Sequence, residues 1–340
     1  MAEITASGPP PAAAPDPAGD EDTPRAIFTP VDRADRAFRI LLRSGGLAVF
    51  AITGLIAFFL VYQAHSAFAK AGWSFLSTSA FIPQQGHFGI AAALPDGVVI
   101  ALIALAVAVP TAITAAVFIS EFAPVRLRRP LIAVIDLMAA IPSIVYALWG
   151  VFFLQPRVVG LARWASDHLG GAIPPLKVRG GEEQSLFTSS PFLAGLVVSL
   201  MVVPIATSIC REVYSQAPVG EREAAYALGS SRWGMVRTVV LPYGRGGTVG
   251  AIMLGFGRAM GETIAVSLII SPGYFFTWRI FEHNGLSIPA LIALRYQEST
   301  PEILSALMAA GLVLFTVTLA VNAAAGVVVA RSRSGQQTAD

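Results

Sequence analysis

Charged side chains are rare in this sequence: Asp, Glu, Lys and Arg together make up 13% of its 340 residues, against about 25% in an average soluble domain. Hydrophobic residues make up 55%, and they are gathered into long runs that contain almost no charge. Such runs are typical of membrane-spanning helices. The composition therefore excludes an ordinary cytosolic enzyme and predicts an integral membrane protein.

Cysteine and histidine are also scarce, which limits the chemistry that the chain can perform. The single cysteine, Cys210, excludes a disulfide within the chain, and we expect it to be a small buried side chain. The four histidines lack the spacing of a metal site, and no catalytic triad or phosphate-binding Walker loop is recognisable. We therefore expect no bound metal or cofactor and no ATP hydrolysis by this chain. The net charge of +2 is spread between the apolar runs and gives no indication of nucleic-acid binding.

Six apolar runs have the length of about 20 residues that a helix needs to cross the hydrocarbon of a bilayer. The predicted spans are residues 45–69, 97–120, 131–155, 192–210, 248–271 and 303–330. Formal charges occur inside only the third and the fifth of these runs. We therefore expect an all-α membrane protein with six transmembrane helices.

The placement of Lys and Arg predicts how the chain is oriented, because basic loops are retained on the cytoplasmic side. Fifteen basic residues fall on one side of the predicted spans and seven on the other. The majority side holds both termini and the loop 211–247, so we expect these in the cytoplasm. The loop 156–191, rich in Gly and Pro, is expected on the outer face.

The ends of the chain differ in composition from the spans. Residues 1–30 are rich in Pro, Ala, Gly and acidic residues and lack a signal-peptide pattern, which predicts a disordered cytoplasmic tail. Residues 31–44 alternate Arg and Asp with apolar residues, which predicts an amphipathic helix at the inner membrane interface. We expect residues 45–330 to form the transmembrane domain and residues 331–340 to form a second cytoplasmic tail.

The predicted cytoplasmic loop 211–247 has the pattern of two short helices. Residues 219–228 favour helix, Gly229 suits a left-handed C-cap, and Ser230 or Ser231 can cap a second helix over 232–241. Pro242 is expected to stop that second helix. A short amphipathic helix at the cytoplasmic mouth of a bundle can be a docking surface, here with small residues at Ala224, Ala225 and Gly229. The alternative is a solvated connector that packs beneath its own bundle.

The fifth predicted span contains two opposite charges, Arg258 and Glu262, four residues apart and therefore on one face of a continuous helix. Each charge costs about 2.5–3.5 kcal/mol at the centre of a span, so both are expected to face a protein interior or an aqueous cavity. Gly255, Gly257 and Gly261 keep the helix thin, which allows close packing or a cavity. One interpretation is a self-neutralising pair that stabilises helix contacts.

The other interpretation of this pair is anion handling. A guanidinium offers a planar fork of donors that matches a tetrahedral oxyanion. A carboxylate beside it can accept a hydrogen bond only from an anion that still carries a proton, which phosphate does and sulfate does not. The combination of Arg258 and Glu262 therefore favours phosphate.

A proline in the third predicted span indicates a kink or a break. Pro142 removes a backbone hydrogen bond, and Ser143 and Tyr146 can then face the interior; a simple bend is the alternative. Asp136, six residues earlier, is interpreted as a paired interfacial acid and is not included in the site.

Residues 223–242, EAAYALGSSRWGMVRTVVLP, resemble the EAA loop of ABC importer permeases. In that family the loop is a coupling helix that seats in a cleft of the ATPase subunit. The resemblance implies this role for Glu223, Ala224, Ala225, Gly229, Leu241 and Pro242.

Three further stretches, GRAMGETIAV (257–266), IPSIVYALWG (141–150) and FISEFAP (118–124), resemble the PstC-type permeases of bacterial phosphate ABC importers. The likeness covers roughly residues 85 to 330 and implies the MetI-like fold of a type I importer, with Arg258 and Glu262 taking part in phosphate passage. Ala147 stands where those permeases usually have Gly, so packing near Tyr146 does not carry over. The tail and the outer loop are also longer here.

The resemblance implies a permease in the bacterial cell membrane that forms half of a phosphate pathway and is not itself an enzyme. The implied partners are a PstA-type permease, a dimer of PstB-type ATPases that uses ATP and Mg²⁺, and a PstS-type phosphate-binding protein on the outer face. Two alternatives stay open. One is an importer of another oxyanion such as sulfate or molybdate, and the other is a membrane-embedded enzyme that uses Glu262 as acid or base on a lipid.

Overall fold

The computed structural model describes residues 33–178, 187–275, 277–298 and 300–333. The predicted tail 1–30, the end of the predicted tail 331–340 and the centre of the loop 156–191 lie outside these residues. The chain divides into two units, 1–54 and 55–340. The first unit contributes, among the described residues, the beginning of helix α1, and the second contains everything that follows.

The described residues are almost entirely helical, which confirms the predicted all-α class. The α-helices are α1 (Arg33–Ala71), α2 (Ser74–Ser77), α3 (Ala93–Val117), α4 (Val125–Ala140), α5 (Ser143–Trp149), α6 (Gln155–Leu169), α7 (Pro191–Ser215), α8 (Val219–Ala227), α9 (Arg232–Met235), α10 (Leu241–Tyr243), α11 (Arg245–Gly261), α12 (Ile264–Ile269), α13 (Ile288–Arg295) and α14 (Pro301–Arg333). The π-helical segments are η2 (Phe118–Phe122), η3 (Gly150–Leu154) and η6 (Val236–Val240). The 3-10 turns are η1 (Pro83–Gln85), η4 (Pro174–Leu176) and η7 (Tyr296–Glu298), and β1 (Phe81–Ile82) pairs antiparallel with β2 (His87–Phe88).

Five helices among the described residues are long and apolar enough to cross a membrane, where the sequence predicts six. They cover Arg33–Ala71, Ala93–Phe122, Ser143–Leu169, Pro191–Ser215 and Pro301–Val327. The predicted spans 131–155 and 248–271, which are the two that contain charges, are each broken in the structure. The third span therefore begins at Ser143 and continues to Leu169, into the predicted outer loop.

Helix α1 covers the described part of the predicted interfacial helix, from Arg33, and continues without interruption into the predicted first span. No break separates the two between Arg33 and Ala71. Good helix formers and apolar residues follow one another without a stop signal, so the predicted helix leads directly into the span. Its position at the inner membrane interface stays a prediction.

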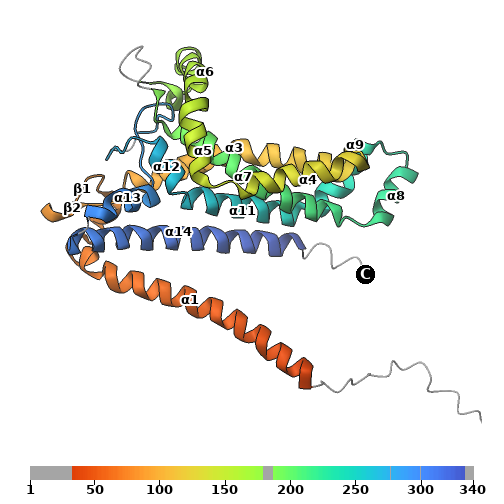
Figure 1. Ribbon diagram of the computed structural model, residues 1–340, viewed down its shortest axis with the longest axis horizontal. Helices are drawn as coiled ribbons and strands as arrows, with labels where there is room; N and C mark the ends of the chain where they lie inside the picture. Colours follow the sequence, from red (N-terminus) through yellow and green to blue (C-terminus); the bar gives the residue numbers. More distant parts are fainter. Residues whose placement is uncertain (1–32, 179–186, 276, 299, 334–340) are drawn as a thin grey trace, which may run out of the picture. The chain divides into compact units, whose positions relative to one another are not determined.

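The core of the second unit is formed by α3, α7 and α11, which run alongside one another (Figure 1). Helix α3 presents alanines at helical spacing to α7, all of them buried: Ala101, Ala104, Ala108, Ala112 and Ala116. Small side chains let the helix backbones approach closely, which is the usual basis of helix packing in lipid. A Cβ on Gly255 of α11 would lie 2.7 Å from Val202 Cγ1 of α7, so close packing also requires a glycine there. Cys210 is buried in this core, as predicted.

A second cluster of buried residues lies where the end of α1 meets α13 and the beginning of α14. The Ser305 hydroxyl donates to Gln63 O at 2.7 Å and accepts from the Ser66 hydroxyl at 2.7 Å and the Ala67 N–H at 3.1 Å. This serine of α14 therefore bonds to three polar groups of α1 where the two helices cross.

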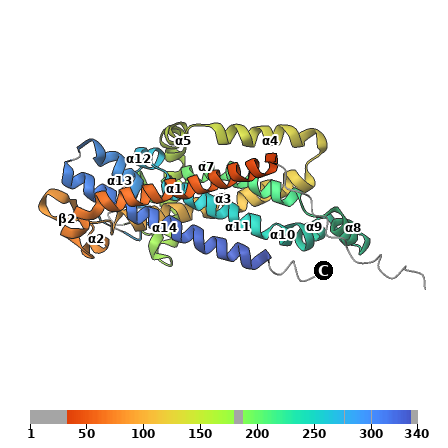
Figure 2. The ribbon, with the colours of Figure 1, turned by 90° about the horizontal axis from the view of Figure 1, so that it is seen from below.

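The two ends of the α3–α7–α11 core carry different structures. Helices α8 and α9 lie at one end, and α12 and α13 lie at the other (Figure 1 and Figure 2). A third small cluster, which contains Val159, Ala162, Phe187 and Phe281, joins α6 to the segment that precedes α13.

Candidate functional site

The charged pair of the fifth predicted span lies at a helix break. Helix α11 ends at Gly261, Glu262 is extended (φ −69°, ψ 123°), and α12 begins at Ile264. The prediction that Arg258 and Glu262 share one face of a continuous helix is therefore wrong. The long apolar run concealed the break, because hydrophobicity does not report where backbone hydrogen bonding stops.

The two charged side chains have different environments. Arg258, in the last turn of α11, is exposed, whereas Glu262 retains 9% exposure. Glu262 Oε1 accepts a hydrogen bond from the backbone N–H of Ala265 at 3.3 Å, so the carboxylate caps the first turn of α12. No ion pair between the two is found in the described part of the chain, and the structure does not support a self-neutralising pair.

The glycines around Arg258 divide between the core and an open side. Gly255 faces the core, but an added Cβ on Gly257 or Gly261 would meet nothing within 4 Å. The α11–α12 break therefore borders open space on its exposed side. An exposed guanidinium beside open space is positioned to bind an anion.

The third predicted span is broken at Pro142, and not merely bent. Helix α4 ends at Ala140, and both Ile141 and Pro142 are extended. Tyr146 is buried, and its hydroxyl donates to Met138 O at 2.8 Å across the break. The tyrosine therefore satisfies a carbonyl group near the end of α4, while Ser143 is half-buried in the first turn of α5.

The two breaks lie close together. Helix α12, which follows the break at Glu262, packs against α5, which follows the break at Pro142. The structure thus brings the predicted pathway residues into one region, although the Tyr146 hydroxyl is already engaged with Met138 and Ser143 has no described contact with the charged groups. Asp136, excluded from the site, is exposed on α4.

The predicted two-helix pattern of the loop 211–247 is present. Helix α8 covers Val219–Ala227, Gly229 has φ +80°, and the Ser231 hydroxyl accepts from the Gly234 N–H at 3.1 Å to cap α9. The prediction for Pro242 is wrong. Helical structure continues from α9 through η6 and α10 to Tyr243. Pro242 is tolerated because it follows the π-helical segment η6, where the regular α-helical hydrogen bonding is already interrupted.

The predicted docking residues do not all face outward. Glu223, Ala224 and Gly229 are exposed, whereas Ala225 and Leu241 pack against the core and Pro242 is half-buried. The predicted small-residue face at Ala224, Ala225 and Gly229 is therefore wrong for Ala225.

Three apolar side chains missing from the prediction are exposed instead: Val219, Tyr226 and Leu228. Leu228, at 89% exposure, extends the apolar surface of α8 next to the Gly229 turn.

Sequence reasoning also missed Arg222, which precedes the EAA residues. Its guanidinium contacts the Glu121 carboxylate and the backbone of α7. An arginine in a loop and a glutamate in FISEFAP each look like ordinary membrane-edge charges, so no sequence signal joins them.

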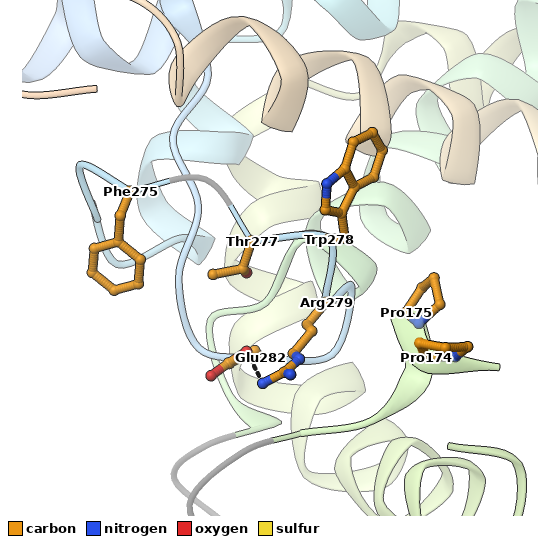
Figure 3. Close-up of a pocket in the computed structure, with 7 residues that line it drawn as sticks. All are labelled: Pro174, Pro175, Phe275, Thr277, Trp278, Arg279 and Glu282. Atoms are coloured by element: carbon orange, nitrogen blue, oxygen red, sulfur yellow. Dashed lines mark ion pairs between the residues drawn. The ribbon is translucent and has the colours of Figure 1, made fainter. Parts of the chain in front are cut away.

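At the other end of the core, a pocket of about 660 Å³ opens between η4 and the segment before α13 (Figure 3). Its lining residues are Pro174, Pro175, Phe275, Thr277, Trp278, Arg279 and Glu282. Arg279 Nη1 lies 3.6 Å from Glu282 Oε2, and Trp278 is 73% exposed. Within the described residues no group of His, Cys, Asp and Glu is suited to hold a metal ion.

Residues 108–334 match the family described as "Binding-protein-dependent transport system inner membrane component". The chain is 39% identical over 304 residues to "Phosphate transport system permease protein PstC 2" of Mycobacterium tuberculosis, covering 87% of this chain and 92% of that protein. It is 37% identical over 320 residues to "Phosphate transport system permease protein PstC" of Mycobacterium leprae, covering 92% and 97%. The PstC of Xylella fastidiosa (strain 9a5c) is 37% identical over 295 residues, covering 85% and 88%. The chain therefore belongs to the family of binding-protein-dependent transport system inner membrane components and is a multi-pass membrane protein.

Proposed function

We propose that this chain is the permease subunit of an ATP-driven importer of inorganic phosphate and forms half of its translocation pathway. Relatives that share 37–39% identity over most of the chain carry the name of a phosphate transport permease. The structural observation that carries the proposal is the exposed Arg258 guanidinium beside the α11–α12 break, where Gly257 and Gly261 border open space.

The chemistry of the break favours phosphate among the oxyanions. The planar donor fork of Arg258 matches two oxygens of a tetrahedral anion. Glu262 is oriented by the bond from the Ala265 N–H, and as a carboxylate it can accept only from an anion that retains an O–H. The names of the relatives likewise give no support to a sulfate or molybdate importer or to a lipid-modifying enzyme.

A second permease is needed to complete the pathway. Arg258 is exposed, and so are the apolar side chains of Leu254 on α11 and of Ile264 and Leu268 on α12. A guanidinium facing lipid at this depth would be costly, so a protein surface is the better neighbour. We propose that a homologous PstA-type permease covers this side and supplies the remaining ligands of the anion.

The remaining partners would act at the two ends of the core. We propose that α8 faces the cytoplasm and seats in a dimer of PstB-type ATPases, which use ATP and Mg²⁺, and that this chain binds neither. A PstS-type phosphate-binding protein would deliver phosphate at the opposite end, which carries the pocket of Figure 3. Closure of the ATPase dimer would displace α8 and switch access to the site from one side to the other.

The test is uptake of labelled phosphate by vesicles that contain the two permeases and the ATPase, supplied with the binding protein. Arg258→Ala is expected to reduce uptake at least about thirtyfold while the complex still assembles, because it removes the charged donor of the anion. Arg245→Ala, at the other end of the same helix and also exposed, is the matched control and should leave uptake within about twofold. Normal uptake by the assembled Arg258→Ala complex would make Arg258 a structural residue. ATP-independent turnover of a lipid by the chain alone would replace the proposal with an enzyme.

A further inference from the structure

The strongest unassigned feature of the structure is a buried ionic contact between α8 and the core. Arg222, on α8, places Nη1 at 3.1 Å from both Glu121 Oε1 and Glu121 Oε2, and Nη2 donates to Tyr214 O at 2.7 Å. Glu121 lies in η2, at the end of α3, and Tyr214 lies in the last turn of α7. One guanidinium therefore joins α8, η2 and α7. Arg222 and Glu121 are 101 residues apart in the sequence.

This contact differs from the surface ion pairs of the chain. The Glu121 side chain is 5% exposed and the Arg222 side chain 20%, whereas Arg39 and Asp35 of α1 are 58% and 44% exposed. Exposed pairs contribute little, because solvent screens them. Removal of one partner from a buried pair leaves an uncompensated charge, and the planar guanidinium also fixes the direction of its partners.

Few other contacts attach α8 to the core. No residue of α8 is fully buried, and Ala225 is the one apolar side chain of α8 that packs against the main cluster of the described residues. After the Gly229 turn, Arg232 of α9 places its guanidinium 5.7 Å from the centre of the Phe122 ring. Arg222 before the turn and Arg232 after it thus both contact η2. This segment is π-helical, and π-helical segments often occur at functional sites.

We infer that Arg222 is a positioning residue that fastens α8 to the ends of α3 and α7, so that movement of α8 is transmitted to the two most closely packed helices of the core. The inference rests on the proposed function, in which an ATPase displaces α8. Without this contact, α8 would still dock, but it would be held to the core mainly by the packing of Ala225 and by the chain on either side, at Pro218 and Gly229. ATP would then be hydrolysed without a matching movement of phosphate.

The test measures ATP hydrolysis and phosphate uptake in the same vesicles and compares the phosphate moved per ATP. Arg222→Gln is expected to keep the ATPase bound and active but to lower the ratio about tenfold, within the range of measured coupling between sites. Glu121→Gln should act in the same direction. The double variant should be no worse than the worse single variant, because the two residues act as one unit. Arg237→Gln, an exposed arginine of η6 in the same loop, is the matched control and should leave the ratio unchanged.

A chemical cross-link provides a test that does not depend on the ion pair itself. Cys210 is the single cysteine of the chain and is buried, so Cys210→Ala gives a clean background. In that background, the double variant Arg222→Cys, Glu121→Cys is expected to hydrolyse ATP without moving a matching amount of phosphate. A short bifunctional thiol reagent should restore the ratio of phosphate to ATP, and a monofunctional reagent of similar size should not.

The outcomes separate this inference from the proposed function. If the parent complex moves no phosphate with ATP, the proposed function fails. If the parent is active and the assembled Arg222→Gln complex keeps its phosphate-to-ATP ratio, the inference is overturned and the pair is merely structural. If Arg222→Gln does not assemble, the cross-linked pair decides, and failure of the bifunctional reagent to restore the ratio overturns the inference.

Discussion

At the scale of single residues, the observed role of Glu262 can be separated from its proposed role. Its Oε1 accepts from the Ala265 N–H and caps α12, and its carboxylate charge lies on the proposed route of the anion. A cap needs only an acceptor oxygen, which glutamine also has. Selection of a protonated anion by the proposed mechanism needs the full carboxylate.

Glu262→Gln is therefore expected to change selectivity and leave stability nearly unchanged. The amide can donate to sulfate, so sulfate should compete with phosphate uptake about tenfold better than in the parent. Glu262→Ala should instead lower stability by about 1 kcal/mol, because the cap is lost. Competition uptake and thermal unfolding of the purified complex measure the two effects. Unchanged sulfate competition in Glu262→Gln would remove Glu262 from the selectivity mechanism.

At the scale of elements, local chemistry predicted the loop 211–247 better than it predicted the spans. Helix α8, the left-handed Gly229 and the Ser231 cap follow from the nearest few residues. Pro142 signalled the first break, although not whether the helix bends or ends there. The break after Gly261 lies in a long apolar run without a proline, and apolar character does not reveal where the backbone leaves the helix. The contact of Arg222 with Glu121 spans 101 residues and exists only after the helices have packed.

Two glycines of the loop 211–247 provide a matched comparison of backbone effects. An added Cβ would meet nothing within 4 Å at either Gly220 or Gly229, but only Gly229 has a positive φ, of +80°. Gly229→Ala is expected to destabilise the turn by about 1–2 kcal/mol, since an L-residue disfavours this conformation. Gly220→Ala, in α8, is expected to stabilise the helix by roughly 0.5–1 kcal/mol.

The measurement for this pair is limited proteolysis of the loop, which reports local opening, together with the ratio of phosphate moved to ATP hydrolysed. Gly229→Ala should be cleaved faster and should move less phosphate per ATP hydrolysed. Gly220→Ala should show neither change. Equal behaviour of the two variants would mean that the orientation of α9 relative to α8 does not depend on the Gly229 turn.

At the scale of the whole molecule, the breaks in two predicted spans have a common consequence. Helices α5 and α12 pack together at the end of the core that lacks α8. Irregular backbone within a membrane is tolerated where it lies inside protein or lines a water-filled cavity. The pairing of the two breaks therefore agrees with a polar path beside α5 and α12 in the proposed function. Helices α8 and α9 of the loop 211–247 lie at the other end of the core (Figure 1 and Figure 2).

The orientation of this arrangement in the membrane can be tested with single cysteines. In a Cys210→Ala background, Leu228→Cys places a thiol at an 89% exposed position beside the Gly229 turn, and Phe275→Cys places one at a 62% exposed position of the pocket. The excess of Lys and Arg around α8 predicts that Leu228→Cys lies in the cytoplasm. A membrane-impermeant maleimide added to spheroplasts should then label Phe275→Cys at once and Leu228→Cys only after permeabilisation. The reverse pattern would place α8 outside the cell, where no ATPase could reach it, and the proposed coupling through Arg222 would have no source of movement.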